Sequence, residues 1–262
     1  MHLETVLYNI QDSIAKITLN RPDAKNAINL QMAKDLFSAS LSCSTDPRIR
    51  VLIIAGAGDS FCIGGDVKDF NLNIDVLSNR LIEITTYLHS AISILSRINV
   101  PVIVGIKGIT AGAGIGLACS GDIIVASESA LFTMAYTGVG LSPDAGATYF
   151  LPRIIGLRKS LEMVLTNRQL SALEAKEIGL VSQVVPDSNM LEYINSLASQ
   201  LSTRATKAIA MSKILLHRGC VETLETQMEN ERKAMSEMGH TYDASEGIRA
   251  FCEKRKPQFQ GR

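Results

Sequence analysis

The stretch Pro101-Val-Ile-Val-Gly-Ile106, followed by Gly108-Ile-Thr-Ala-Gly-Ala-Gly-Ile-Gly116, joins an apolar run to a glycine-rich turn. β-Branched residues dominate the first part, which predicts a buried strand. Glycines and alanines then lead into Leu117-Ala118, a pattern typical of a helix N-terminus whose free N–H groups face a negative group. Close packing of that helix on a sheet is an equally simple interpretation. In either case a strand leads directly into a helix, as in α/β proteins.

Strands and helices alternate on both sides of this stretch. Residues 6–10 and 13–19 predict a β-hairpin, because apolar and polar residues partly alternate in them. Residues 30–43 and 76–98 carry apolar side chains at helical spacing, and the second helix must end before Pro101. Further strands are predicted at residues 51–55, 122–126 and 130–134. The predicted fold class is therefore α/β.

The pattern changes near Asn189, after which no strand is predicted. Four helices are expected there, at residues 190–201, 205–217, 221–238 and 243–254. We therefore divide the chain into an α/β core, residues 1–188, and a helical C-terminal region, residues 189–262.

Composition excludes several classes of partner. The 262 residues include 26 Lys and Arg and 26 Asp and Glu, so no net field favours nucleic acid or an anionic membrane. The cysteines are odd in number, widely spaced and without a CxxC motif, which predicts reduced thiols and neither disulfides nor a zinc site. No secretory leader or membrane-spanning run is evident, so we expect a cytoplasmic protein.

Several catalytic motifs are missing from the sequence. Leu117 stands where the dinucleotide fingerprint GxGxxG requires its last glycine, and neither GxxxxGK[ST] nor GxSxG occurs. There is also no HExxH, and the scattered histidines are interpreted as surface or core residues: His2, His89, His217 and His240. No metal or separate cofactor is predicted.

Two loops carry the candidate chemistry. In Ser60-Phe-Cys-Ile-Gly-Gly-Asp-Val-Lys68, the paired glycines allow a ligand to approach main-chain N–H groups. Taken alone, however, the segment favours an ordinary turn in which Asp66 caps the next helix. Ser142-Pro143-Asp144 holds the one carboxylate that we assign to chemistry. Its alternative interpretation is a helix start, with Ser142 as the cap and Asp144 in the first turn.

The sequence resembles the crotonase, or enoyl-CoA hydratase/isomerase, superfamily along nearly its whole length. The matching segments are Asn20-Arg-Pro22, Phe61-Cys-Ile-Gly-Gly-Asp-Val-Lys68, Pro101-Val-Ile-Val-Gly-Ile-Lys-Gly108, Ala111-Gly-Ala-Gly114, Cys119-Ser-Gly-Asp-Ile123, Gly140-Leu-Ser-Pro-Asp-Ala-Gly146, Leu151-Pro-Arg153 and Ala175-Lys-Glu-Ile-Gly-Leu-Val181. The resemblance implies a spiral of β-β-α units, a helical trimerisation region, a homotrimer or dimer of trimers, and acyl-CoA as the substrate.

The resemblance also implies roles for individual residues. The main-chain N–H groups of Ile63 and Ala113 would form an oxyanion hole for the thioester oxygen. For coenzyme A and the acyl group it implies the following substrate-binding residues: Lys25, Ala27, Gly64, Gly65, Asp66, Tyr136, Gly140, Phe251 and Lys254. The last two would come from the C-terminal helix, and for the lysines solvated surface positions are the alternative.

The chain departs from the hydratases of this superfamily at two positions. Gly116 and Tyr136 stand where those enzymes carry a pair of glutamates. Asp144 matches the acid of the Δ3,Δ2-enoyl-CoA isomerases and of the ring isomerases of phenylacetate breakdown. We therefore predict an acyl-CoA double-bond isomerase. A hydratase, a hydrolytic or dehalogenating enzyme with Asp as nucleophile, and an inactive binding subunit are the alternatives.

Overall fold

A computed structural model describes residues 3–262, so that His2 lies outside the described residues. Its larger sheet has six strands in the order β1-β2-β3-β5-β7-β10. The strands are β1 (Val6–Gln11), β2 (Ile14–Leu19), β3 (Val51–Gly56), β5 (Val102–Ile106), β7 (Ile123–Ser127) and β10 (Gln183–Val185). The β1–β2 hairpin is antiparallel, and the other neighbours run parallel, as expected when helices connect successive strands.

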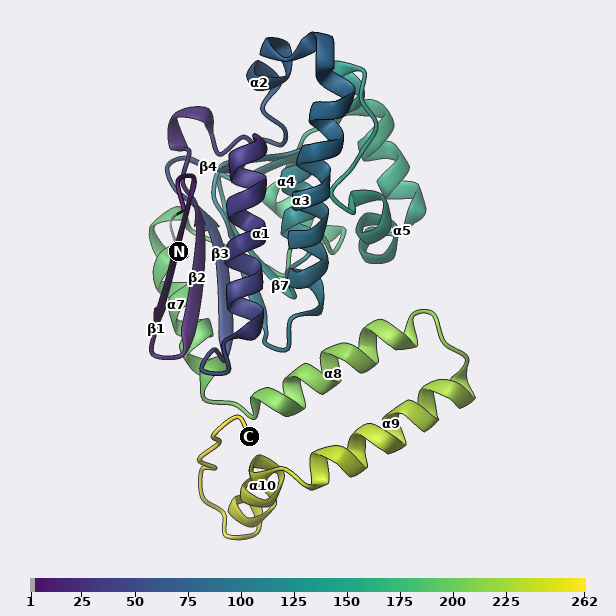
Figure 1. Ribbon diagram of the computed structural model, residues 1–262. Helices are drawn as coiled ribbons and strands as arrows, with labels where there is room; N and C mark the ends of the chain where they lie inside the picture. Colours follow the sequence, from purple (N-terminus) through teal and green to yellow (C-terminus); the bar gives the residue numbers. More distant parts are fainter. Residues whose placement is uncertain (1–2) are drawn as a thin grey trace.

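Helices cover both faces of the larger sheet (Figure 1). On one side lie α1 (Leu30–Thr45) and α3 (Leu77–Arg97), and on the other lies α7 (Met190–Ser202). Side chains alternate along β3 to serve both layers: Leu52 and Ile54 join the main core, whereas Val51 and Ile53 pack in the cluster beneath α7. Because both faces are covered there, the central strands β3 and β5 carry no polar side chains.

A smaller sheet in the order β4-β6-β8-β9 lies beside the larger one. Its strands are β4 (Ser60–Cys62), β6 (Ile109–Ala111), β8 (Leu131–Thr133) and β9 (Leu170–Ser171). The chain leaves β6 through Gly112 and enters the short helix α4 (Ala113–Cys119), which confirms the helix start predicted from the glycine-rich stretch. β4 pairs with β6, so the two glycine-containing segments lie next to each other.

The remaining helices are α2 (Val67–Leu72), α5 (Ala147–Thr166), α6 (Ala172–Glu177), α8 (Thr206–Gly219), α9 (Leu224–Gly239) and α10 (Tyr242–Cys252). The last three form an arm that extends away from the sheets (Figure 1). The four predicted C-terminal helices are confirmed, but the first of them, α7, packs on the larger sheet rather than in the arm.

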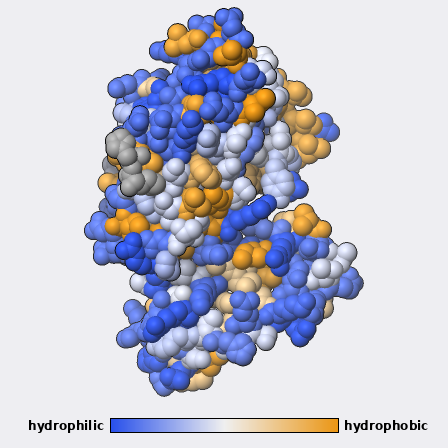
Figure 2. Space-filling model, in the orientation of Figure 1, coloured by the Kyte–Doolittle hydropathy of each residue, from blue (hydrophilic) through white to orange (hydrophobic). Residues whose placement is uncertain are grey.

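Apolar side chains remain exposed on this arm, and Figure 2 shows the hollow that separates it from the rest of the molecule. Leu216, Leu224 and Phe251 expose 74%, 69% and 86% of their surface. Several large apolar side chains exposed on one part of a protein are typical of an interaction surface. Among residues 3–262, no helix combines the length and the apolar character that crossing a bilayer requires.

Candidate active site

A cavity of about 270 Å³ lies between α2, α3, the start of α4 and the loop before α5. Apolar side chains form most of its wall, including Phe70 from α2 and Ile84 and Leu88 from α3. Ile63, Ala113, Tyr136 and Asp144 also line it. The structure thus brings the three residues predicted to be catalytic into one cavity, with Asp144 as the one carboxylate among the described residues that line it.

Main-chain N–H groups meet where the loop after β4 passes the start of α4. A Cβ atom on Gly64 would lie 3.3 Å from the nitrogen of Ala113 and 3.0 Å from the oxygen of Ala111, so this glycine allows the close approach. Within residues 3–262, neither the N–H of Ile63 nor that of Ala113 donates a hydrogen bond to the protein. Both N–H groups therefore remain available to a ligand oxygen.

The loop that carries Asp144 is not the first turn of a helix. α5 begins at Ala147, and its cap position is Gly146, which has no side chain to donate or accept. The helix-start interpretation of Ser142-Pro143-Asp144 is therefore wrong. The physical reason is the backbone: Ala145 and Gly146 both have positive φ, at 54° and 70°, and this conformation interrupts a right-handed helix.

Tyr136 holds the Asp144 carboxylate directly. Its phenol donates to Oδ1 of Asp144 at 2.5 Å. Burial raises the pKa of the Tyr136 phenol well above its usual value, and the charge of the neighbouring Asp144 raises it further. Tyr136 therefore stays protonated and remains a hydrogen-bond donor at neutral pH.

Gly116, on α4, leaves no room for a side chain. A Cβ atom there would lie 2.2 Å from the main-chain oxygen of Ala145 and 2.7 Å from its Cβ. A glutamate cannot be accommodated at this position while the Asp144 loop keeps its course. The packing of the Ala145 main chain against α4 therefore both excludes a glutamate at residue 116 and sets the position of Asp144.

Cys62 is an inert neighbour of the site. It is fully buried, and burial raises the pKa of its thiol to about 12, with the charge of Asp144 adding to the effect. A thiol in this state is not a nucleophile at neutral pH.

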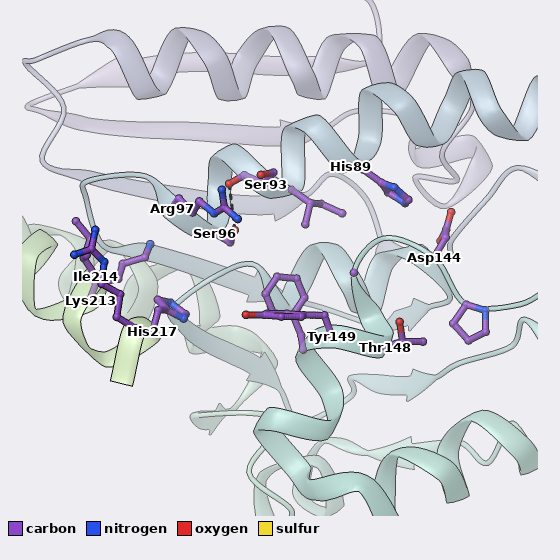
Figure 3. Close-up of a pocket in the computed structure, with 15 residues that line it drawn as sticks. His89, Ser93, Ser96, Arg97, Asp144, Thr148, Tyr149, Lys213, Ile214 and His217 are labelled. Carbon is purple, nitrogen blue, oxygen red and sulfur yellow. Dashed lines mark hydrogen bonds between the residues drawn. The ribbon is translucent and has the colours of Figure 1, made fainter. Parts of the chain in front are cut away.

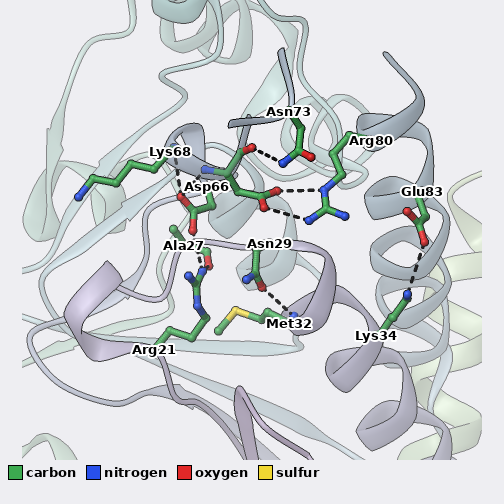
Figure 4. A network of polar contacts seen from close by, with 11 residues as sticks. Arg21, Ala27, Asn29, Met32, Lys34, Asp66, Lys68, Asn73, Arg80 and Glu83 are labelled. Carbon is green, nitrogen blue, oxygen red and sulfur yellow. Dashed lines mark hydrogen bonds and ion pairs between the residues drawn. The ribbon is translucent and has the colours of Figure 1, made fainter. Parts of the chain in front are cut away.

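Asp66 has structural partners for both carboxylate oxygens (Figure 4). One oxygen accepts from the N–H groups of Lys68 and Asp69 and caps α2, which confirms the alternative interpretation of Asp66 as a cap. The other accepts from Nη1 of Arg21 at 2.9 Å. Arg80 and Asp69 form a second ion pair beside it. This network fixes the loop that carries Gly64 and Gly65.

The other residues predicted to bind substrate are spread along the chain. Lys25 and Ala27 lie in the loop beside the Gly64 segment, because Ile28 exchanges main-chain hydrogen bonds with that segment. Gly140 has φ 73° and ends the 3-10 turn Thr137–Val139. Phe251 and Lys254 belong to α10 and its end, on the arm and away from this cavity. The structure does not bring them to the site within one chain.

A second, larger cavity of about 870 Å³ lies on the other side of Asp144, between α3, α5 and α8 (Figure 3). His89 of α3 lines it, and Nε2 of His89 accepts a hydrogen bond from the N–H of Ala145 at 3.1 Å. His89 is exposed, in keeping with its interpretation as a surface residue, and the structure adds this main-chain contact. No sequence signal indicates this contact, because its partner is a main-chain group 56 positions away.

Residues 3–262 contain no group of three or more His, Cys, Asp or Glu side chains arranged to hold a metal ion. What the site offers is one carboxylate, one phenol that binds it, and two free N–H groups. Free N–H groups suit a developing oxyanion, and a carboxylate suits proton transfer.

Comparison with known proteins agrees with this geometry. The sequence model described as enoyl-CoA hydratase/isomerase matches residues 9–262. The chain is 35% identical over 261 residues to the 1,2-epoxyphenylacetyl-CoA isomerase of Escherichia coli, which covers 99% of this chain and 100% of that protein.

Two solved structures of enoyl-CoA hydratases are also similar to the chain. That from Bacillus anthracis has a TM-score of 0.93 at 30% identity and covers 99% of this chain and 100% of its own. That from Polaromonas sp. JS666 has a TM-score of 0.92 at 30% identity, with coverage of 97% and 99%. The predicted crotonase fold is confirmed, and the chain belongs to the enoyl-CoA hydratase/isomerase family.

Proposed function

We propose that this protein is an acyl-CoA double-bond isomerase that uses Asp144 as its only proton carrier. The observation that supports this most directly is the cavity with Asp144 as its one carboxylate among the described lining residues. Moving a double bond requires one base that takes a proton from one carbon and returns it to another. A single carboxylate, kept in position by the Tyr136 phenol, is sufficient for that task.

The reaction begins when the thioester oxygen of a 3-enoyl-CoA binds the N–H groups of Ile63 and Ala113. The Asp144 carboxylate takes a proton from C2, the electrons of that C–H bond form a C1–C2 double bond, and the thioester oxygen becomes negative. The N–H groups stabilise this dienolate, at about 3 kcal/mol for each donor in comparable sites. Protonated Asp144 then returns the proton to C4, the C2–C3 double bond forms, and the thioester is restored.

Tyr136 and the apolar wall serve this step in different ways. The Tyr136 phenol keeps one oxygen of Asp144 in a fixed position, which leaves the other oxygen for carbon. Phe70, Ile84 and Leu88 line the cavity and would hold the acyl chain away from water. Excluding water favours return of the proton to the substrate over addition of water.

A hydratase is the second candidate, because the similar solved structures carry that name. Adding water to a 2-enoyl-CoA requires one group to deprotonate the water while a proton is delivered to carbon. Gly116 cannot carry the second acid, because the main chain of Ala145 occupies the space of its side chain. This steric fact favours the isomerase.

Product analysis tests the proposal. Purified protein is incubated separately with a 3-enoyl-CoA, a 2-enoyl-CoA and 1,2-epoxyphenylacetyl-CoA, and the products are followed by mass spectrometry and chromatography. An isomerase converts the first or third compound into a product of unchanged mass. Rapid addition of one water to the 2-enoyl-CoA would establish the hydratase instead, and absence of turnover with all three would support an inactive binding subunit.

Coenzyme A enters this scheme as part of the substrate, with no separate cofactor. Lys25 and Ala27 lie in the loop that pairs through Ile28 with the Gly64–Gly65 segment, which supports our assignment of both to coenzyme A binding from the same chain. Phe251 and Lys254 lie on the arm, so we assign their contribution to the site of a neighbouring subunit in a homotrimer or dimer of trimers.

A further inference from the structure

The backbone on the C-terminal side of Asp144 is strained. Ala145 is a fully buried residue with a Cβ atom, yet its φ is 54°. For an L-residue other than glycine this left-handed conformation costs about 1–2 kcal/mol. Such a conformation persists only where neighbouring groups hold it. The neighbours of Ala145 therefore determine where Asp144 lies.

The carbonyl side of Ala145 packs against α4. A Cβ atom on Gly116 would lie 2.2 Å from the Ala145 oxygen, so the two main chains are in direct contact. This contact blocks movement of the loop toward α4. It does not prevent movement in the opposite direction, toward the 870 Å³ cavity that Asp144 also lines.

The N–H side of Ala145 is held by α3. The Ala145 N–H belongs to the peptide bond that joins Asp144 to Ala145, and it donates to Nε2 of His89 at 3.1 Å. In Figure 3 the His89 side chain extends from α3 toward the segment that carries Asp144. His89 thus opposes the movement that Gly116 leaves open, and the loop is held from both sides.

We infer that His89 is a positioning residue, which holds Asp144 in its productive place through the Ala145 N–H. The inference rests on the proposed function, in which Asp144 transfers the proton. Nε2 must offer its lone pair, so the ring is neutral and carries its proton on Nδ1. His89 touches neither the substrate nor the carboxylate in this role, and it acts only through the backbone.

Two variants of similar length separate hydrogen bonding from packing. In His89→Gln the amide oxygen can accept from the Ala145 N–H, and in His89→Met nothing can. We expect His89→Met to lower kcat about five- to tenfold with little change in KM, because the variant loses one hydrogen bond. The kcat of His89→Gln should stay within about twofold of the wild-type value. Equal kcat in all three proteins, or an equal loss in both variants, would overturn the inference.

Hydrogen exchange of the backbone tests the same inference without any turnover. Exchange is measured by mass spectrometry on peptides that cover residues 141–151 of the full-length protein. We expect slow exchange at Ala145 in the wild type and in His89→Gln, and faster exchange in His89→Met. Identical exchange in His89→Met would refute the positioning role even if the isomerase is established, and failure of the isomerase assay would leave this readout intact.

Discussion

Asp144 is held at two different points, its carboxylate by Tyr136 and its peptide bond by His89. Neither contact involves a charged partner. One contact fixes the side chain of Asp144 and the other fixes its main chain, so the base is held in one position beside the substrate.

Tyr136→Phe removes the hydroxyl and leaves the ring. Hydrogen bonds to charged groups contribute about 1.5–3 kcal/mol, so we expect kcat for a 3-enoyl-CoA to fall about tenfold or more. Steady-state kinetics checks this, with Tyr149→Phe as the control, since Tyr149 lines the other cavity. A Tyr136→Phe enzyme with unchanged kcat would show that the hydrogen bond is dispensable.

The buried cysteines make stability depend on pH. Burial raises the pKa of Cys119 from 9.0 to about 12, so the folded state keeps a proton that the unfolded state releases. This stabilisation is present below pH 9 and is lost as the pH rises from 9 toward 12. At pH 10.5 the loss from one such thiol is about 2 kcal/mol.

Cys119→Ala should therefore lose less stability between pH 8 and pH 10.5 than the wild type does, by about 2 kcal/mol. Urea unfolding at the two pH values measures it. Cys252→Ala serves as the control, because Cys252 is exposed. Equal losses in the wild type and in Cys119→Ala would contradict the proposed origin of the effect.

At the scale of elements, α4 and the Asp144 loop depend on each other. Gly116 lets the main chain of Ala145 lie directly on α4. A side chain at residue 116 must displace that loop, and with it Asp144. The chain thus carries either an acid on α4 or this placement of Asp144, but not both at once.

Gly116→Ala should lower both activity and stability. Overpacking of this kind typically costs about 1–3 kcal/mol, and we expect kcat to fall at least tenfold because Asp144 moves. Gly239→Ala is the matched control, since no atom lies within 4 Å of a Cβ built there. Thermal unfolding and kinetics measure the two effects. Gly116→Glu should not create a hydratase, and brisk hydration by that variant would refute the packing argument.

The sequence predicts the long elements well and the short ones poorly. The periodic segments that became β3, β5, α1 and α3 lie where we expected them, within one or two residues. Strands β4, β6 and β9 have only two or three residues, and their pairing partners lie far along the chain, so no local pattern reveals them. The same limit applies to the site. The motifs indicate Asp144, but the roles of His89 and Gly116 depend on a backbone contact that appears only after folding.

At the scale of the whole molecule, the arm of α8, α9 and α10 exposes apolar side chains that a single chain does not cover. Assembly into a trimer would bury them and would bring Phe251 toward a neighbouring site. We expect light scattering to give a mass of three or six chains. The double variant Leu224→Lys and Phe251→Lys should reduce that mass, whereas Leu157→Lys on α5 should not. A wild-type protein that is monomeric at micromolar concentration would contradict the proposal.

The most direct measurement is the turnover of a 3-enoyl-CoA by Asp144→Asn. Asparagine keeps the size of the side chain and its contact with Tyr136 but cannot carry the proton. We expect kcat to fall about a thousandfold, within the range typical of general acid–base groups. Asp59→Asn, which changes an acid with a 99% exposed side chain, should leave kcat unchanged. If Asp144→Asn isomerises the substrate at the rate of the wild type, Asp144 is not the proton carrier and the proposed mechanism is wrong.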